Sequence, residues 1–240
     1  MNNEDVKTTA EAVEFAKRNK NRITKELTAL EKYLPDAIPV SIFMAGSPGA
    51  RKTEYSENLI DILEKNKKHK VIRIDADELR KYFPNYNGKN SYLFQGAVSA
   101  IANKIHDIVL EQKQTFILDG TFSKYEKAKE NIGRSLSRNR AVFIFYVYQK
   151  PEVAWKFTQA RELIEGRNIP KNIFIEQFLN SRETVNKIRS DFNEKVVIFL
   201  VKKNFETHAV EDVIEITPSG KRIDDYLEQR YTKESLEKLL

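Results

Sequence analysis

The chain of 240 residues has no cysteine, only eight glycines and seven prolines, and no apolar run long enough to cross a membrane. The absence of cysteine excludes disulfides and thiolate chemistry. Three histidines, His69, His106 and His208, are too far apart for a zinc signature, so we expect no structural metal. The first residues are polar and lack the apolar core of a secretion signal, so we expect a cytoplasmic protein without a membrane partner.

The composition is typical of a folded domain and does not by itself decide the partner. Apolar residues make up 40% of the chain and charged residues 32%, which separates it from disordered sequences. The length suits one α/β domain with added helices. The net charge of +6 fits a site for small polyanions and fits a nucleic-acid surface equally well.

Short apolar segments alternate with helical patterns along most of the chain. Segments rich in Val, Ile and Phe are typical of strands that are buried on both faces of a parallel sheet. We therefore predict an α/β fold with a doubly wound parallel sheet of the P-loop NTPase type and added helices at both termini. Strands are expected at 40–45, 71–74, 115–118, 141–147, 196–201 and 212–216.

Three regions are predicted from these patterns. Residues 1–37 form an N-terminal helical extension, because apolar residues recur at helical spacing between 9 and 33. Residues 38–217 form the α/β domain, which includes a helical lid region at about 151–193. Residues 218–240 are expected to form a C-terminal helix.

A phosphate-binding loop is predicted between Gly46 and Thr53, which match the P-loop pattern at every specified position except the second glycine. In such a loop, backbone N–H groups wrap the β-phosphate, Lys52 reaches the β- and γ-phosphates, and the Thr53 hydroxyl binds Mg²⁺. The alternative is an ordinary strand-to-helix turn. The predicted nucleotide-binding residues are Gly46, Ser47, Pro48, Gly49, Ala50, Arg51, Lys52 and Thr53.

Arg51 occupies the position of the second glycine in the P-loop pattern. If this position has a positive φ, a residue with a Cβ costs about 1–2 kcal/mol. Our hypothesis is that Arg51 weakens nucleotide binding or misplaces the γ-phosphate. An outward swing of the side chain, natural divergence and engineered inactivation are also compatible with the sequence.

Carboxylates follow two of the predicted strands. Asp75 and Asp77 come after the second strand and Asp119 after the third, at the sheet edge where such folds bind ligands. A kinase acting on an alcohol needs a carboxylate to accept the hydroxyl proton. Asp119 also stands where P-loop proteins often hold Mg²⁺ or its water. The structural alternatives are a helix cap at Asp75 or Asp77 and a turn at Asp119-Gly120.

Two arginines are candidates for phosphate binding in the lid region. Arg161 lies late in a predicted helix, and Arg167 lies just past its expected end at Gly166. Guanidinium groups clamp the oxygens of a transferring phosphoryl group and contribute about 10³–10⁵-fold to the rate where this has been measured. One such arginine is usually only solvated charge, but two beside a P-loop favour the functional interpretation.

Together these motifs resemble the zeta toxin family of bacterial toxin–antitoxin systems, over about residues 38–200. The resemblance implies an ATP- and Mg²⁺-dependent kinase that phosphorylates the 3′-hydroxyl of the amino sugar of UDP-N-acetylglucosamine and so blocks peptidoglycan synthesis. It also implies an antitoxin that docks close to the ATP site. The matching segments are Gly46 to Thr53, Ile74 to Arg80 with Pro84-Asn-Tyr86, Asp119-Gly-Thr121, Arg161, and Gly166 to Pro170.

The resemblance also assigns the nucleotide-binding residues. Lys52 and Thr53 match the ligands of the nucleotide and of Mg²⁺. Arg161 and Arg167 are similar to the pair of arginines that closes over the triphosphate. Arg51 departs from the family, which has glycine at this position.

On the substrate side, the resemblance makes Asp77 the base that takes the proton of the sugar hydroxyl. Asp75, Asp77, Asp119 and Thr121 are the predicted substrate-binding residues. Residues 1–37 are either a surface for the antitoxin, a built-in inhibitory helix, or a helix that packs its apolar stripe on the core.

Three other functions are compatible with the sequence. The first is another small-molecule kinase on the same fold, which phosphorylates an antibiotic or a different nucleotide sugar. The second is a catalytically silent interaction protein. The third is a nucleic-acid-binding protein or polynucleotide kinase, but this predicts aromatic residues interleaved with lysines in one patch. Basic residues are instead spread along the chain, so nucleic acid is not an expected partner.

Overall fold

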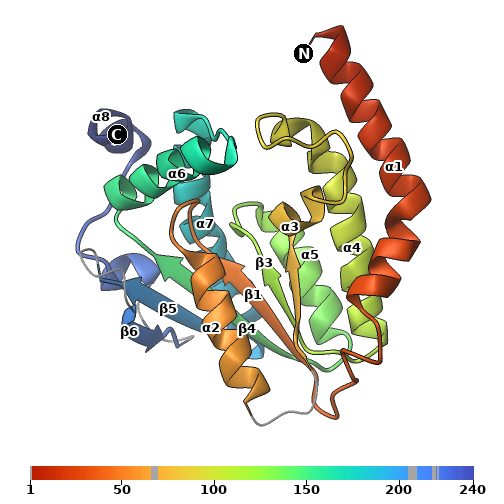
Figure 1. Cartoon of the computed structure of the whole chain (residues 1–240). Helices are drawn as coiled ribbons and strands as arrows, with labels where there is room; N and C mark the ends of the chain where they lie inside the picture. The colour runs from red at the N-terminus through yellow and green to blue at the C-terminus, as the bar shows by residue number, and fades with distance from the viewer. Residues whose placement is uncertain (1, 66–69, 205–209, 218–219, 221) are drawn as a thin grey trace.

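The computed structural model describes residues 2–65, 70–204, 210–217, 220 and 222–240, so His69 and His208 lie outside the described residues. Six strands form one sheet: β1 (Val40–Ala45), β2 (Ile72–Asp75), β3 (Phe116–Asp119), β4 (Ala141–Tyr148), β5 (Val197–Lys203) and β6 (Val210–Glu215). Their order is β2-β3-β1-β4-β5-β6 (Figure 1). The first five strands in this order pair in parallel, and β6 pairs antiparallel with β5.

Helices cover both faces of the sheet, which confirms the predicted doubly wound α/β fold. Alternate residues of β1 face opposite ways, so Ile42 and Met44 pack under α2 while Phe43 belongs to the larger core on the other face. The helices are α1 (Asn3–Leu27), α2 (Lys52–Glu64), α3 (Ala76–Arg80), α4 (Gln95–Glu111), α5 (Tyr125–Leu136), α6 (Pro151–Glu165), α7 (Lys171–Phe192) and α8 (Lys233–Leu239), with 3₁₀ turns η1 (Ser91–Phe94), η2 (Asn193–Lys195) and η3 (Ile223–Tyr226).

Helix α1 packs on the core rather than standing apart from it. Ala12, Ala16 and Ile23 are buried, and the helix lies along α4 and η1 at the edge of the molecule (Figure 1). Glu26 accepts a hydrogen bond of 3.1 Å from the Tyr82 hydroxyl, so α1 also supports the segment after α3. The interpretation of α1 as a helix that packs its apolar stripe on the core is therefore confirmed, while an inhibitory role stays a prediction. No helix in the described part of the chain has the length and apolar composition that a membrane span requires.

The helical region predicted at 151–193 consists of two helices. Gly166 ends α6 in the left-handed conformation, with φ of 71°, and Pro170 precedes α7. The C-terminal helix is shorter than the prediction for 218–240, because within the described residues only α8 is α-helical there. Asn186 of α7 accepts from the N–H of Ile223 at 3.2 Å and holds this segment as the turn η3 instead.

Candidate active site

The loop between β1 and α2 has the backbone of a phosphate-binding loop. Gly46 and Gly49 have positive φ values of +135° and +71°. A Cβ on Gly49 would lie 2.0 Å from the carbonyl oxygen of Ala154 and 2.8 Å from the hydroxyl of Thr158, both in α6. The loop is therefore seated directly on α6, and only glycine fits at position 49.

Substituting Gly49→Ala is expected to destabilise the chain by about 2–4 kcal/mol, because it combines left-handed strain with overpacking against α6. Gly133→Ala is the matched control, since a Cβ there meets nothing within 4 Å and the residue lies inside α5. The control is expected to stabilise the chain by about 0.5–1 kcal/mol. Urea unfolding measures both. Equal unfolding free energies for Gly49→Ala and the natural chain would contradict the seating of the loop on α6.

Lys52 begins α2, and its ammonium group reaches back over the loop. Its Nζ donates a hydrogen bond of 2.7 Å to the carbonyl oxygen of Ser47. Burial lowers the pKa of Lys52 to about 8, although the charges of Asp119 and Asp77 oppose this decrease. Asp119 and Asp77 are therefore close enough to Lys52 for their charges to act on its ionisation.

Arg73 of β2, which sequence reasoning missed, organises two of the predicted carboxylates. Its Nη2 lies 2.6 Å from Asp75 Oδ2 and 2.9 Å from Asp119 Oδ2, and its side chain is only 9% exposed. Ser56 of α2 also donates to Asp119 Oδ2, at 3.1 Å. The available signal was a charged residue in an apolar strand, two positions before Asp75 and therefore on the same face.

Asp75 caps a helix, which is the structural alternative given in the sequence analysis. Its Oδ1 accepts a hydrogen bond of 2.8 Å from the N–H of Asp77 and so caps α3. Burial raises the pKa of Asp75 to about 6, and the charges of Asp77 and Asp119 add to the increase. A helix cap does not exclude contact with a substrate, so the substrate-binding role stays a prediction.

Asp77 is held by arginines from both sides of the crevice. It forms ion pairs with Arg80 of its own helix and with Arg167 of the connection between α6 and α7, and Arg161 Nη2 lies 3.7 Å away. Burial alone would raise the pKa of Asp77, but the charges of these arginines outweigh it and lower the pKa. Asp77 is therefore an ionised carboxylate at neutral pH.

The last turns of α6 and the connection to α7 bring the two predicted arginines, Arg161 and Arg167, to Asp77. A Cβ on Gly88, in the loop after α3, would lie 2.1 Å from the carbonyl oxygen of Glu165, so the two segments are in direct contact. Arg161 also pairs with Glu165 at 3.0 Å, whereas Arg167 points at Asp77. The structure thus brings both arginines together with Asp77, and their role in binding phosphate stays a prediction.

Arg51 is the N-cap residue of α2 and has a left-handed backbone, with φ of 63° and ψ of 38°. The positive φ is the condition under which a residue with a Cβ is strained, and Arg51 meets it. Its Nε lies 2.6 Å from Glu54 Oε2, and its guanidinium lies over the ring of Phe157 in α6. The backbone thus has a left-handed conformation that glycine adopts without strain, while the side chain is directed toward Glu54 and Phe157.

Thr121 contacts the start of the loop, and Thr53 follows its end. The carbonyl of Thr121, just after β3, accepts a hydrogen bond of 3.2 Å from the N–H of Gly46 and so ties the loop to the strand end. Thr53 lies in the first turn of α2, three residues before Ser56, which contacts Asp119. Residues three apart share a helix face, so the Thr53 hydroxyl and the Asp119 carboxylate lie on the same side of α2.

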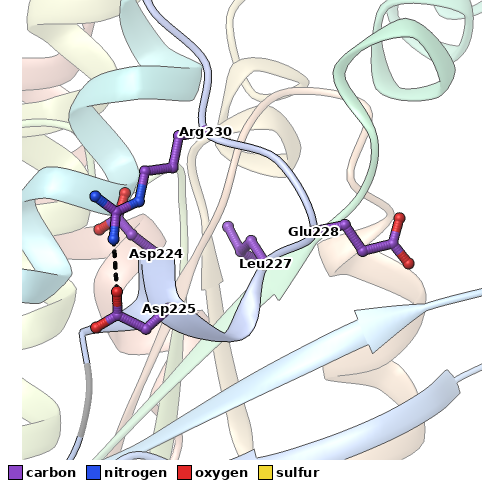
Figure 2. Close-up of a pocket in the computed structure, with 5 residues that line it drawn as sticks. All are labelled: Asp224, Asp225, Leu227, Glu228 and Arg230. Atoms are coloured by element: carbon purple, nitrogen blue, oxygen red, sulfur yellow. Dashed lines mark hydrogen bonds and ion pairs between the residues drawn. The ribbon is translucent and has the colours of Figure 1, made fainter.

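A surface hollow near η3 differs from the P-loop region in its charge (Figure 2). It is lined by Asp224, Asp225, Leu227, Glu228 and Arg230. Its carboxylates are paired within the chain, since Asp225 lies 2.6 Å from Arg230 and Asp224 lies 3.1 Å from Arg182. A mainly acidic hollow does not suit a phosphate, so the candidate active site is the group of charged residues beside the P-loop. Within the described residues, no group of three or more His, Cys, Asp or Glu side chains is placed to hold a metal ion by itself.

The parallel sheet, the glycine-bearing loop before α2 and the charged residues at the strand ends define a P-loop protein of kinase-like architecture. The family model of zeta toxins matches residues 23–212. The chain belongs to the zeta toxin family, which confirms the resemblance seen in the motifs.

Solved structures show the same fold. A structure of the PezAT chromosomal toxin–antitoxin system of Streptococcus pneumoniae is 17% identical with a TM-score of 0.65, and the match covers 93% of this chain and 91% of that chain. A structure of AvrRxo1-ORF1:-ORF2 with ATP is 13% identical with a TM-score of 0.60, and the match covers 92% of this chain and 70% of that chain. No curated protein sequence matches the chain.

Proposed function

We propose that this chain is a kinase that transfers the γ-phosphate of ATP to the 3′-hydroxyl of the amino sugar of UDP-N-acetylglucosamine, and so blocks peptidoglycan synthesis. One observation carries the proposal: Asp77 pairs with the lid residue Arg167, and both are close enough to Lys52 of the P-loop for their charges to act on it. Membership of the zeta toxin family supports a phosphotransferase. The sugar nucleotide rests on the family resemblance alone.

ATP would lie along the P-loop, with its phosphates accepting hydrogen bonds from the loop N–H groups and from Lys52. Binding would move the Lys52 ammonium from the carbonyl of Ser47 to the phosphates. Hydroxyl and carboxylate oxygens are ligands that Mg²⁺ prefers, so Thr53 and Asp119 would hold it; the contact of Asp119 with Ser56, three residues after Thr53 in α2, supports this pairing. When bound, Mg²⁺ would neutralise charge on the β- and γ-phosphates.

Transfer would use Asp77 as the proton acceptor. The 3′-hydroxyl gives its proton to the Asp77 carboxylate while its oxygen forms a bond to the γ-phosphorus, and the bond from this phosphorus to the β-phosphate oxygen breaks to release ADP. Arg161 and Arg167, which hold Asp77 in the structure, would turn to the phosphoryl oxygens. The triphosphate would thus draw the arginines away and free the base at the moment of transfer.

ATP affinity is expected to fall above about pH 8. The charged form of Lys52 binds the phosphates. Because the pKa of Lys52 is about 8, the charged form predominates below that pH and is lost above it. The phosphates of ATP are already fully ionised there, so affinity approaches a loss of about tenfold per pH unit. Calorimetric titration from pH 7 to about pH 9.5 measures it.

The control for this pH dependence is Lys52→Arg, because a guanidinium keeps its charge throughout the range. Its affinity, whatever its value at pH 7, is expected to stay constant as the pH rises. A constant affinity in the natural chain would show that Lys52 does not carry its charge to the nucleotide.

The substrate is tested by mass spectrometry after incubation with ATP, Mg²⁺ and UDP-N-acetylglucosamine. The proposal predicts a product with one added phosphoryl group, on the 3′-oxygen of the amino sugar. A panel with other nucleotide sugars, an aminoglycoside and a DNA oligonucleotide separates the alternatives. Phosphorylation of another panel member, with none of UDP-N-acetylglucosamine, would replace the proposed substrate.

We also propose that an antitoxin binds this chain and blocks its ATP site. The support is that the similar PezAT structure is that of a toxin–antitoxin system. Helix α1 is a candidate surface for the partner, although its buried face packs against α4.

The hypothesis from the sequence that Arg51 weakens nucleotide binding stays a prediction, and it depends on where the guanidinium lies when ATP binds.

A further inference from the structure

We propose that Glu54 and Phe157 are positioning residues that hold Arg51 beside the phosphate loop, so that the loop stays open to ATP despite the lost glycine. The inference rests on the proposed function, since it concerns the same nucleotide site. It selects one outcome for Arg51 among those that the sequence left open, namely a local accommodation of its side chain.

The backbone at Arg51 already has the shape that a phosphate loop needs. Its φ of 63° and ψ of 38° are left-handed values, which glycine adopts without strain, and α2 begins at the next residue. The left-handed conformation costs free energy for an arginine, but the loop keeps its shape. What remains to be decided is whether the long side chain fills the space where the phosphates bind.

Two contacts hold the side chain to one side. Arg51 Nε lies 2.6 Å from Glu54 Oε2, one turn along α2, and the guanidinium carbon lies 5.4 Å from the centroid of the Phe157 ring. A carboxylate on one side and an aromatic face on the other are the two partners that a guanidinium prefers. Together, Glu54 and Phe157 hold the guanidinium of Arg51 between α2 and α6.

The carboxylate of Glu54 is itself held in place by a second ion pair. Lys203 at the end of β5 is 1% exposed, and its Nζ lies 3.5 Å from Glu54 Oε1, the oxygen that does not pair with Arg51. Glu54 therefore bridges a buried lysine and the arginine. Because one oxygen is anchored to the sheet, Glu54 is not free to follow Arg51 toward the loop, and the arginine is drawn outward instead.

A charge argument points the same way. Lys52 already has its pKa lowered by burial and, to a smaller degree, by the nearby Arg167 and Arg161. A further unpaired cation inside the loop would add repulsion in the absence of a nucleotide. With ATP bound, an arginine released from Glu54 would compete with Lys52 for the phosphates and displace them from the loop N–H groups.

The test is a double-mutant cycle on ATP affinity. Four proteins are compared by calorimetry with Mg²⁺ and ATP: the natural chain, Glu54→Gln, Arg51→Gly, and the double variant. We expect Glu54→Gln to weaken ATP binding about five- to thirtyfold when Arg51 is present and less than about twofold when glycine is present, as for coupled neighbours. The natural chain and Arg51→Gly are expected to bind ATP within about threefold of each other.

Two further variants keep the test specific. Asp61→Asn removes one negative charge from the exposed side of α2 and is expected to leave ATP affinity unchanged. Phe157→Leu keeps an apolar side chain on α6 but removes the aromatic face, so it should weaken binding only when Arg51 is present. Thermal unfolding of each variant confirms that the chain is folded.

The outcomes separate this inference from the proposed function. Equal effects of Glu54→Gln in both backgrounds, or no effect in either, would overturn the positioning role. ATP binding by Arg51→Gly but not by the natural chain would overturn the accommodation and leave the proposed function standing. Absence of ATP binding by both would overturn the proposed function together with this inference.

Discussion

Replacing Arg167 with alanine is expected to slow phosphoryl transfer by about 10³–10⁵-fold, the range for arginines that stabilise the transferring phosphoryl group. Its place is set by local structure, because Gly166 ends α6 and packs against the loop after α3, which directs Arg167 into the crevice. Arg161 is expected to contribute less, since it is more exposed and also pairs with Glu165.

Single-turnover kinetics with ATP and UDP-N-acetylglucosamine measure the effect of Arg167→Ala on the transfer step itself. ATP affinity is expected to change less than about tenfold, because Lys52 and the loop N–H groups still hold the phosphates. Lys156→Ala is the matched control, as it removes a positive charge from the exposed face of α6. A loss of less than tenfold in Arg167→Ala would show that this arginine serves only to close the lid.

Replacing Asp77 with asparagine is expected to reduce turnover by about 10²–10⁴-fold, the contribution of a positioned general base. Asparagine keeps the shape of the side chain but cannot accept the hydroxyl proton. ATP affinity is expected to stay within about threefold, because the change lies on the substrate side of the crevice. The comparison is made both in the natural chain and in Arg51→Gly, so that the state of the P-loop does not limit it.

The fold of Asp77→Asn has to be measured as well, because Arg80 is only 6% exposed at its side chain and loses its charged partner. Glu78→Gln is the control, since it removes a neighbouring negative charge from an exposed side chain of α3 and should change turnover by less than about threefold. A folded Asp77→Asn that keeps most of its turnover would refute the role of Asp77 as the base.

The sequence predicted the fold, and it assigned candidate site residues to the strand ends, because both depend on short-range patterns. Apolar segments rich in Val, Ile and Phe become the buried parallel strands, and the carboxyl ends of such strands meet at one edge of the sheet. Asp75 and Asp119 were therefore expected at the same edge of the sheet, and the structure shows in addition that they lie opposite each other in the pairing of β2 with β3. The P-loop was recognisable because glycines and Lys52 stand at fixed positions between a strand and a helix.

What the sequence could not predict depends on contacts between distant segments. Arg73 joins Asp75 to Asp119 only because β2 pairs with β3 in one particular register. The direction of Arg51 depends on α6 and, through Glu54, on the end of β5. The C-terminal segment failed to form the long predicted helix because Asn186 of α7 binds its backbone. Arg73 is visible in the sequence as a charged residue in an apolar strand, but the register of the strands and the packing of α6 and α7 on distant segments leave no local signal.

The central claim is that one crevice brings the phosphates of ATP, the base Asp77 and the lid arginines around a sugar hydroxyl. A crystal structure with a non-hydrolysable ATP analogue, Mg²⁺ and UDP-N-acetylglucosamine tests it most directly. We predict the 3′-hydroxyl within about 2.6–3.2 Å of the Asp77 carboxylate, with Arg167 moved from Asp77 to the γ-phosphate. A sugar bound elsewhere, with Asp77 still paired to Arg167 while the nucleotide occupies the loop, would contradict the claim.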